Sequence, residues 1–186
     1  MTYPIEVAGL KRELPICKVT DDLYIGAFIC FGDAELTVAC ARELLKLVPA
    51  DSYDYIFTAE AKSIPLIQGL AGHSGSAKYF IARKVAKAYM PDPIHVEDHS
   101  ITTAGTQKLF LGRDDADLIR GKRILIMDDV ISTGGSLKAM EALVQEAGGV
   151  VTGKVAVLAE GDAADRTDIK FLKKLPLFNA DGTVKD

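Results

Sequence analysis

The sequence has few cysteines, no long apolar run and no excess of positive charge, and each of these absences excludes a class of protein. Three cysteines without a CxxC pair give no disulfide framework, so we expect a reduced, cytoplasmic chain. No apolar run approaches the roughly 20 residues of a membrane helix, and the N-terminus has no signal-peptide pattern, so we expect no membrane partner. A net charge of −4 argues against nucleic-acid binding, which needs a basic face.

What the sequence does contain is an alternation of β-rich and helical segments, which predicts one α/β domain with a mainly parallel sheet. We expect strands at residues 53–59, 78–84, 108–111, 124–127 and 150–160, and helices at residues 33–48, 64–72 and 135–147. Residues 14–31 predict a β-hairpin outside this alternation, in a small subdomain. Residues 86–106 have two prolines and few large apolar side chains, which indicates a long loop or a weakly paired ribbon.

The stretch from Ile124 to Ser136 combines two different chemistries. An apolar strand ends in Asp128 and Asp129, at the sheet edge where ligands of open α/β folds bind. The glycines and hydroxyls that follow suit a phosphate, because backbone N–H groups and a helix N-terminus favour an anion. The acids repel phosphate, so they suit sugar hydroxyls or a magnesium ion. A ligand with a phosphate on one side and a diol on the other is a ribose phosphate.

With its apolar strand, two acids and T-G-G-S loop, this stretch resembles the phosphoribosyl pyrophosphate motif of type I phosphoribosyltransferases. The resemblance implies that family's fold for residues 1–186: a twisted, mainly parallel sheet flanked by helices, with a small hood from about residues 1–32 plus a C-terminal part. It implies that Asp128 and Asp129 are catalytic, holding the ribose hydroxyls and stabilising positive charge at the sugar. Mg²⁺ would be the cofactor, reached by these acids through water. The 5′-phosphate would be bound by Ser132, Thr133, Gly134, Gly135 and Ser136.

Two further segments resemble the pyrophosphate-binding parts of that family. The first follows the strand at 53–59 and comprises Glu60, Ala61, Lys62 and Ser63, with a cis peptide expected at Ala61–Lys62. The second is an R-K-x-x-K cluster like that of adenine and orotate enzymes, made of Arg83, Lys84 and Lys87. Three cations so close together suit a pyrophosphate. Residues 86–106 would be the family's mobile flap, which excludes water from the reacting sugar.

The segment Phe31-Gly32-Asp33 resembles the F-R-D of adenine enzymes, which makes Phe31 the candidate for stacking on the base. The arginine of that pattern is replaced by Gly32. Orotate enzymes are similar through V-L-A-E, but this chain has Gly161 where they carry an arginine after the acid. A purine is therefore favoured over orotate, with adenine first and xanthine, guanine or hypoxanthine still open.

The resemblance thus implies a homodimeric purine phosphoribosyltransferase, which transfers phosphoribosyl from phosphoribosyl pyrophosphate to a purine base. The products are a nucleoside monophosphate and pyrophosphate. Two alternatives stay open. One is a non-catalytic regulator of the same fold that senses phosphoribosyl pyrophosphate, and the other is an orotate or pyrimidine phosphoribosyltransferase.

Overall fold

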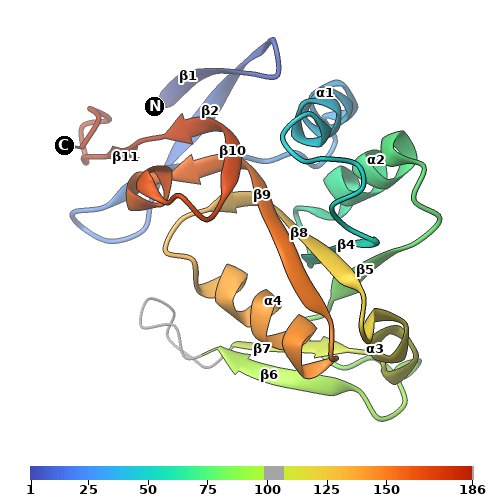
Figure 1. Cartoon of the computed structure of the whole chain (residues 1–186). Coiled ribbons are helices and arrows are strands. Elements are labelled where there is room, and N and C mark those ends of the chain that lie inside the picture. Colours follow the sequence, from blue (N-terminus) through green and yellow to red (C-terminus); the bar gives the residue numbers. More distant parts are fainter. Residues whose placement is uncertain (99–106, 186) are drawn as a thin grey trace.

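A parallel sheet of five strands forms the centre of the computed structural model, which describes residues 1–98 and 107–185 (Figure 1). The strands are β4 (Tyr55–Ala59), β5 (Tyr79–Ala82), β8 (Arg123–Ile131), β9 (Val150–Glu160) and β10 (Lys170–Leu175). Their order is β10-β9-β8-β4-β5, and every neighbouring pair is parallel. The predicted parallel sheet is therefore confirmed, with β8, the strand that carries the two acids, in its middle.

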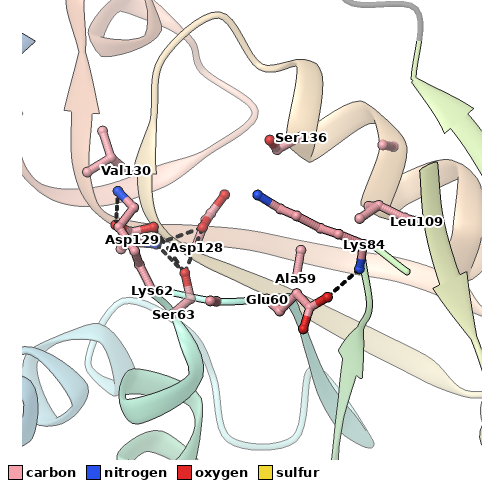
Figure 2. Close-up of a pocket in the computed structure, with 12 residues that line it drawn as sticks. Ala59, Glu60, Lys62, Ser63, Lys84, Leu109, Asp128, Asp129, Val130 and Ser136 are labelled. Carbon is pink, nitrogen blue, oxygen red and sulfur yellow. Dashed lines mark hydrogen bonds and ion pairs between the residues drawn. The ribbon is translucent and has the colours of Figure 1, made fainter. Parts of the chain in front are cut away.

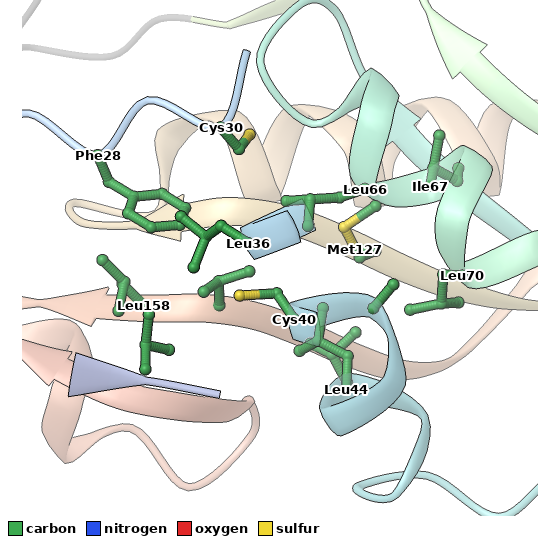
Figure 3. Packing of buried hydrophobic residues seen from close by; sticks show 14 of the residues in the cluster. Phe28, Cys30, Leu36, Cys40, Leu44, Leu66, Ile67, Leu70, Met127 and Leu158 are labelled. Carbon is green, nitrogen blue, oxygen red and sulfur yellow. The ribbon is translucent and has the colours of Figure 1, made fainter. Parts of the chain in front are cut away.

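Helices cover both faces of this sheet, as predicted, because β8 is apolar on both of its sides. Leu125 and Met127 pack toward α1 (Ala34–Leu45) and α2 (Ile64–Ser74). Ile124 and Ile126 pack on the opposite side, toward α4 (Gly135–Glu146) and α3 (Arg113–Ile119). Figure 3 shows the first of these two cores, where the apolar stripes of α1 and α2 meet around Met127. The two cores hold β8 rigidly from both sides, which fixes the position of its carboxyl end.

A second, four-stranded sheet lies beside the first and contains the first and the last strand of the chain. Its order is β1-β2-β3-β11, from β1 (Thr2–Val7), β2 (Leu10–Lys18), β3 (Tyr24–Gly26) and β11 (Leu177–Phe178). The predicted hairpin is confirmed, since Ile16 lies opposite Gly26 and Lys18 opposite Tyr24. We call this element the hood sheet. That it covers a base remains a prediction.

The segment at residues 86–106 is only partly a loop. Strand β6 (Ile94–Asp98) pairs antiparallel with β7 (Gln107–Leu111), which contains the strand predicted at 108–111. Arg83 continues the pairing to Phe110 through two backbone hydrogen bonds of 2.8 and 2.7 Å. Residues 99–106, the rest of the predicted flap, lie outside the described residues. Within the described part, no helix is long and apolar enough to cross a membrane.

The carboxyl end of β8 was predicted wrongly from the sequence. The strand was predicted to end at Met127, but it continues through both acids to Ile131. Its neighbour β9 explains the difference, because Asp128 pairs with Ala156 and Val130 pairs with Leu158 in a continuing parallel ladder. The acids are therefore held by strand backbone and not by a mobile turn. Helix α3, the 3₁₀ helix η1 (Gly161–Asp165) and strands β1, β10 and β11 were not predicted.

Candidate active site

The carboxyl ends of β4 and β8 lie side by side and bring two predicted segments together. Thr58 on β4 is buried, and its hydroxyl donates to the carbonyl oxygen of Met127 on β8 at 2.7 Å. The residues that follow these two points, 59–63 and 128–130, line one cavity of about 280 Å³ (Figure 2). The complete lining is Ala59, Glu60, Ala61, Lys62, Ser63, Lys84, Leu109, Asp128, Asp129, Val130, Ser136 and Ala139. Eight of these twelve were predicted from the sequence.

The loop after β4 contains a cis peptide, but one residue earlier than predicted. The cis bond is Glu60–Ala61 and not Ala61–Lys62. Glu60 still belongs to the sheet, since its N–H donates to the carbonyl oxygen of Ala82 at 2.9 Å. Ala61 lies in the turn before α2, and its carbonyl accepts from the N–H of Ile64 at 3.2 Å. The change of direction therefore falls on the bond between these two residues.

Ser63 connects this loop to the acidic pair. Its hydroxyl lies 2.7 Å from Asp128 Oδ1 and 3.1 Å from Asp129 Oδ1, and it accepts the Asp129 N–H at 3.0 Å. The Asp129 N–H also approaches Asp128 Oδ1 at 2.9 Å. Ser63 is 1% exposed. Its hydroxyl therefore contacts both carboxylates, while its predicted role in pyrophosphate binding stays a prediction.

The two acids differ in their electrostatic surroundings. Asp129 is 4% exposed, and its Oδ2 forms an ion pair of 2.6 Å with Lys62 Nζ. Burial alone would lower the pKa of Lys62, but Asp129 and Asp128 together raise it. Among residues 1–98 and 107–185, no cation forms an ion pair with Asp128, and burial and the neighbouring charge of Asp129 raise its pKa well above the usual range. Asp128 is therefore the acid whose negative charge is still uncompensated, and it favours a ligand that brings hydrogen-bond donors or positive charge.

The loop from Ser132 to Ser136 has the geometry of an anion site. It connects β8 to α4 and lines a small hollow of about 100 Å³. Gly134 is the residue that precedes α4, with φ of 82°, a backbone conformation that glycine adopts without strain. In the part of the chain that the structure describes, no side chain caps the helix there, so the N–H groups of its first turn remain available to an anion. The predicted phosphate loop thus lies next to the acidic pair, with Ser136 lining both hollows.

The three cations of the R-K-x-x-K cluster do not all face the cavity. Figure 2 shows Lys84 extending into it from the side opposite Lys62. Arg83 points elsewhere: its Nε lies 2.7 Å from Glu60 Oε2, and its Nη1 donates to the Tyr89 hydroxyl at 2.9 Å. Glu60 also accepts the Lys84 N–H at 2.5 Å, so this acid holds the cluster in place. Pyrophosphate binding by Arg83 and by Lys87, which does not line the cavity, stays a prediction.

Phe31, the predicted base-binding residue, is 50% exposed and does not line the cavity. Its role also stays a prediction. Sequence reasoning missed Glu160, at the end of β9, which is 6% exposed. Burial raises its pKa, while Ser132 and Lys62 lower it, so it lies close to both predicted loops. The available signal was a charged residue directly after the apolar run of a central strand.

The comparisons with known proteins show the family of the chain. The family model of the phosphoribosyl transferase domain matches residues 47–181. Adenine phosphoribosyltransferase of Mycobacterium avium is 38% identical over 162 residues, covering 86% of this chain and 85% of that protein. Hypoxanthine/guanine phosphoribosyltransferase of Methanotorris igneus is 30% identical over 148 residues, covering 77% of this chain and 76% of that protein. A match to adenine phosphoribosyltransferase of Corynebacterium jeikeium is shorter and covers 42% of that protein.

A solved structure has the same fold. The crystal structure of adenine phosphoribosyltransferase from Thermoanaerobacter pseudethanolicus superposes with a TM-score of 0.64 at 26% identity, covering 76% of this chain and 82% of that chain. The chain therefore belongs to the phosphoribosyltransferase family and has the type I fold. The family predicted from the stretch Ile124–Ser136 is confirmed.

Proposed function

We propose that this protein is a purine phosphoribosyltransferase, with adenine as its base. The observation that carries the proposal is one sheet edge that brings an acidic pair, a phosphate loop and two lysines to two adjoining hollows. Phosphoribosyl pyrophosphate has a group for each of them: a ribose diol, a 5′-phosphate and a pyrophosphate. The names of the M. avium and T. pseudethanolicus relatives support adenine, and that of the M. igneus relative keeps 6-oxopurines as the second candidate.

In this function, each group of the cavity has a part in a sugar-transfer reaction. The carboxylates of Asp128 and Asp129 accept hydrogen bonds from the ribose hydroxyls and stabilise the positive charge that develops as pyrophosphate leaves. Ser63 keeps both carboxylates in place before the substrate arrives, which avoids reorganisation during the reaction. The Ser132–Ser136 loop binds the 5′-phosphate, and Lys84 with Lys62 attracts the pyrophosphate.

Mg²⁺ fits this cavity through the acidic pair. Among residues 1–98 and 107–185, no group of three or more His, Cys, Asp or Glu side chains forms a metal cage. Asp128 has an uncompensated charge, however, and magnesium commonly uses one or two carboxylates together with substrate phosphates and water. Asp128 and Asp129 would hold the ion, which supplies positive charge to the pyrophosphate when bound.

Replacing Lys84 by Met should raise the KM for phosphoribosyl pyrophosphate by about tenfold to 100-fold, because the lost charge-assisted contact is worth roughly 1.5–3 kcal/mol. Lys122→Met is the matched control, since Lys122 is an exposed lysine just before β8, at the other end of the strand from Asp128 and Asp129, and does not line the cavity. Initial rates at varied donor concentration measure both effects. An equal rise of KM in the two variants would contradict the assignment of Lys84 as the pyrophosphate lysine.

The base is tested by measuring pyrophosphate release. The protein is mixed with phosphoribosyl pyrophosphate, Mg²⁺ and one of adenine, hypoxanthine, guanine, xanthine, orotate or uracil. Release with adenine alone is the expected result, and release with hypoxanthine or guanine would move the specificity to 6-oxopurines. Release only with orotate or uracil would replace the purine proposal by a pyrimidine enzyme. Donor binding without release for any base would favour the regulator.

The same proposal extends to the oligomeric state and the compartment of the protein. We propose a homodimer for two reasons. In adenine and orotate enzymes, the R-K-x-x-K segment reaches across a subunit interface. In this chain, a second hollow on the same segment is lined by Arg83, Tyr89 and Tyr79. Sedimentation of the purified protein would test it. Residence in the cytoplasm is proposed from the cysteine content alone.

A further inference from the structure

Arg166, which lies between η1 and β10, contacts the phosphate loop although it is 30 residues away from it in the sequence. A Cβ atom built on Gly134 would stand 2.6 Å from Arg166 Nη1 and 3.8 Å from its Cζ. The guanidinium therefore packs directly against the backbone at the start of α4. A positive charge next to a helix N-terminus is unfavourable by itself, because the helix dipole is positive there. The contact becomes favourable when an anion occupies the loop.

The guanidinium is held in this place by its other two nitrogens. Arg166 Nε and Nη2 donate to the two carboxylate oxygens of Asp168 at 2.9 and 2.8 Å, a two-point contact that fixes the plane of the group. Asp168 also accepts from Lys154 Nζ at 2.6 Å, and Lys154 reaches Glu141 on α4 at 2.8 Å. The Asp168 pKa is lowered, first by Arg166 and then by Lys154, so the carboxylate stays charged.

The third nitrogen of the Arg166 guanidinium, Nη1, takes no part in the contact with Asp168. Within residues 1–98 and 107–185, Nη1 has no hydrogen-bond partner, and it is the nitrogen that lies against Gly134. The side chain is 27% exposed, so its charge is only partly screened by water. The linked ion pairs of Asp168, Lys154 and Glu141 therefore hold the guanidinium of Arg166 in a fixed position. In that position the unused donor Nη1 and its positive charge face the phosphate loop.

We propose that Arg166 is a positioning residue for the 5′-phosphate. It keeps the Gly134 turn in its anion-binding shape and adds a positive charge beside the loop, and Asp168 acts through Arg166 by holding the guanidinium. This inference rests on the proposed function, because it needs a phosphate at Ser132–Ser136. The inference extends the phosphate site by one residue, Arg166, which lies outside the phosphoribosyl pyrophosphate motif.

The test is the affinity for ribose 5-phosphate, measured by calorimetry on the full chain. Arg166→Met should raise Kd about tenfold, since a charge-assisted contact is lost. Arg166→Lys should raise it about threefold, because lysine keeps the charge but cannot make the two-point contact with Asp168. The salt dependence of Kd should fall in the Met variant and persist in the Lys variant. A merely structural role would not separate the two variants in this way.

Two controls isolate the effect. Arg120→Met removes another arginine that packs against a positive-φ glycine, Gly148, and pairs with an aspartate, Asp117, at 3.3 Å. It should leave Kd unchanged. Asp168→Asn should weaken binding several-fold in the wild-type background and have no further effect in Arg166→Met, because Asp168 acts through the arginine. Lys154 retains Glu141 in that variant.

The outcomes separate this inference from the proposed function. If the wild-type protein does not bind ribose 5-phosphate, the phosphate loop itself is wrongly assigned and both ideas fail. If the wild type binds and Arg166→Met and Arg166→Lys bind within twofold of it, the loop assignment stands and the role of Arg166 is wrong. Should Arg166→Met not fold, the Lys variant and Asp168→Asn still decide the question.

Discussion

Replacing Asp128 and Asp129 together by Asn is expected to lower kcat/KM about 1,000-fold or more, with the fold intact. Electrostatic groups aimed at developing charge typically contribute about 100-fold to 1,000-fold each. The asparagine oxygens can still accept from Ser63 and from the Asp129 N–H, so the local hydrogen bonds survive. The matched control is Asp114→Asn with Asp115→Asn, an adjacent acid pair in the first turn of α3. Steady-state rates for both double variants give the comparison.

Full activity in the Asp128/Asp129 double variant would remove the role proposed for the pair. Loss of activity in the α3 control as well would mean that any change of two charges is enough, which would equally contradict it. Circular dichroism of each variant separates a loss of chemistry from a loss of fold.

The single change Asp128→Asn should also make the protein more stable above neutral pH while lowering its activity. The folded pKa of Asp128 is raised by burial and by Asp129, whereas in the unfolded chain it is about 4. Deprotonation is therefore harder in the folded state, and stability is lost as the pH rises from about 4 through the folded pKa. We expect the melting temperature of the variant to exceed that of the wild type at pH 8 and to match it near pH 4.

Gly134→Ala is expected to lower kcat/KM about 100-fold, because a small displacement of a binding loop costs that much in rate. Gly134 has φ of 82°, and a Cβ there would also stand 2.6 Å from Arg166 Nη1. Alanine in this conformation costs about 1–2 kcal/mol, so the turn should shift and misplace the N–H groups that face the phosphate. Initial rates and the Kd for ribose 5-phosphate should both change.

Gly75→Ala provides the matched control for this prediction. Gly75 ends α2 with φ of 74°, and a Cβ there would meet nothing within 4 Å. Both variants should lose stability in urea unfolding because of the same backbone strain, and Gly134→Ala should lose somewhat more because its Cβ also crowds Arg166. Only Gly134→Ala should lose activity. Similar activity in the two variants would show that the Gly134 turn does not have to keep its shape for the reaction.

The part of the site whose residues are adjacent in the chain could be predicted from the sequence, together with the sheet that supports it. Asp128, Asp129 and the Ser132–Ser136 loop are neighbours in the chain, so their spacing alone placed a carboxylate pair next to an anion-binding turn. The apolar run before them had to be a strand covered on both faces, because both of its sides are hydrophobic. Chain order and hydrophobic pattern therefore predicted the central strand and a ribose-phosphate ligand, and the resemblance of this stretch to a known motif indicated the family.

Only the tertiary structure decided which distant groups meet this stretch. Ser63 lies 65 residues from Asp128 along the chain and reaches it because β4 and β8 are adjacent in the sheet. Lys84 enters the cavity while Arg83, its neighbour in a strand that has just ended, turns to Glu60 and Tyr89. Arg166 reaches Gly134 through its contact with Asp168. Such contacts depend on strand order and on which way a side chain points, and neither is encoded by local spacing.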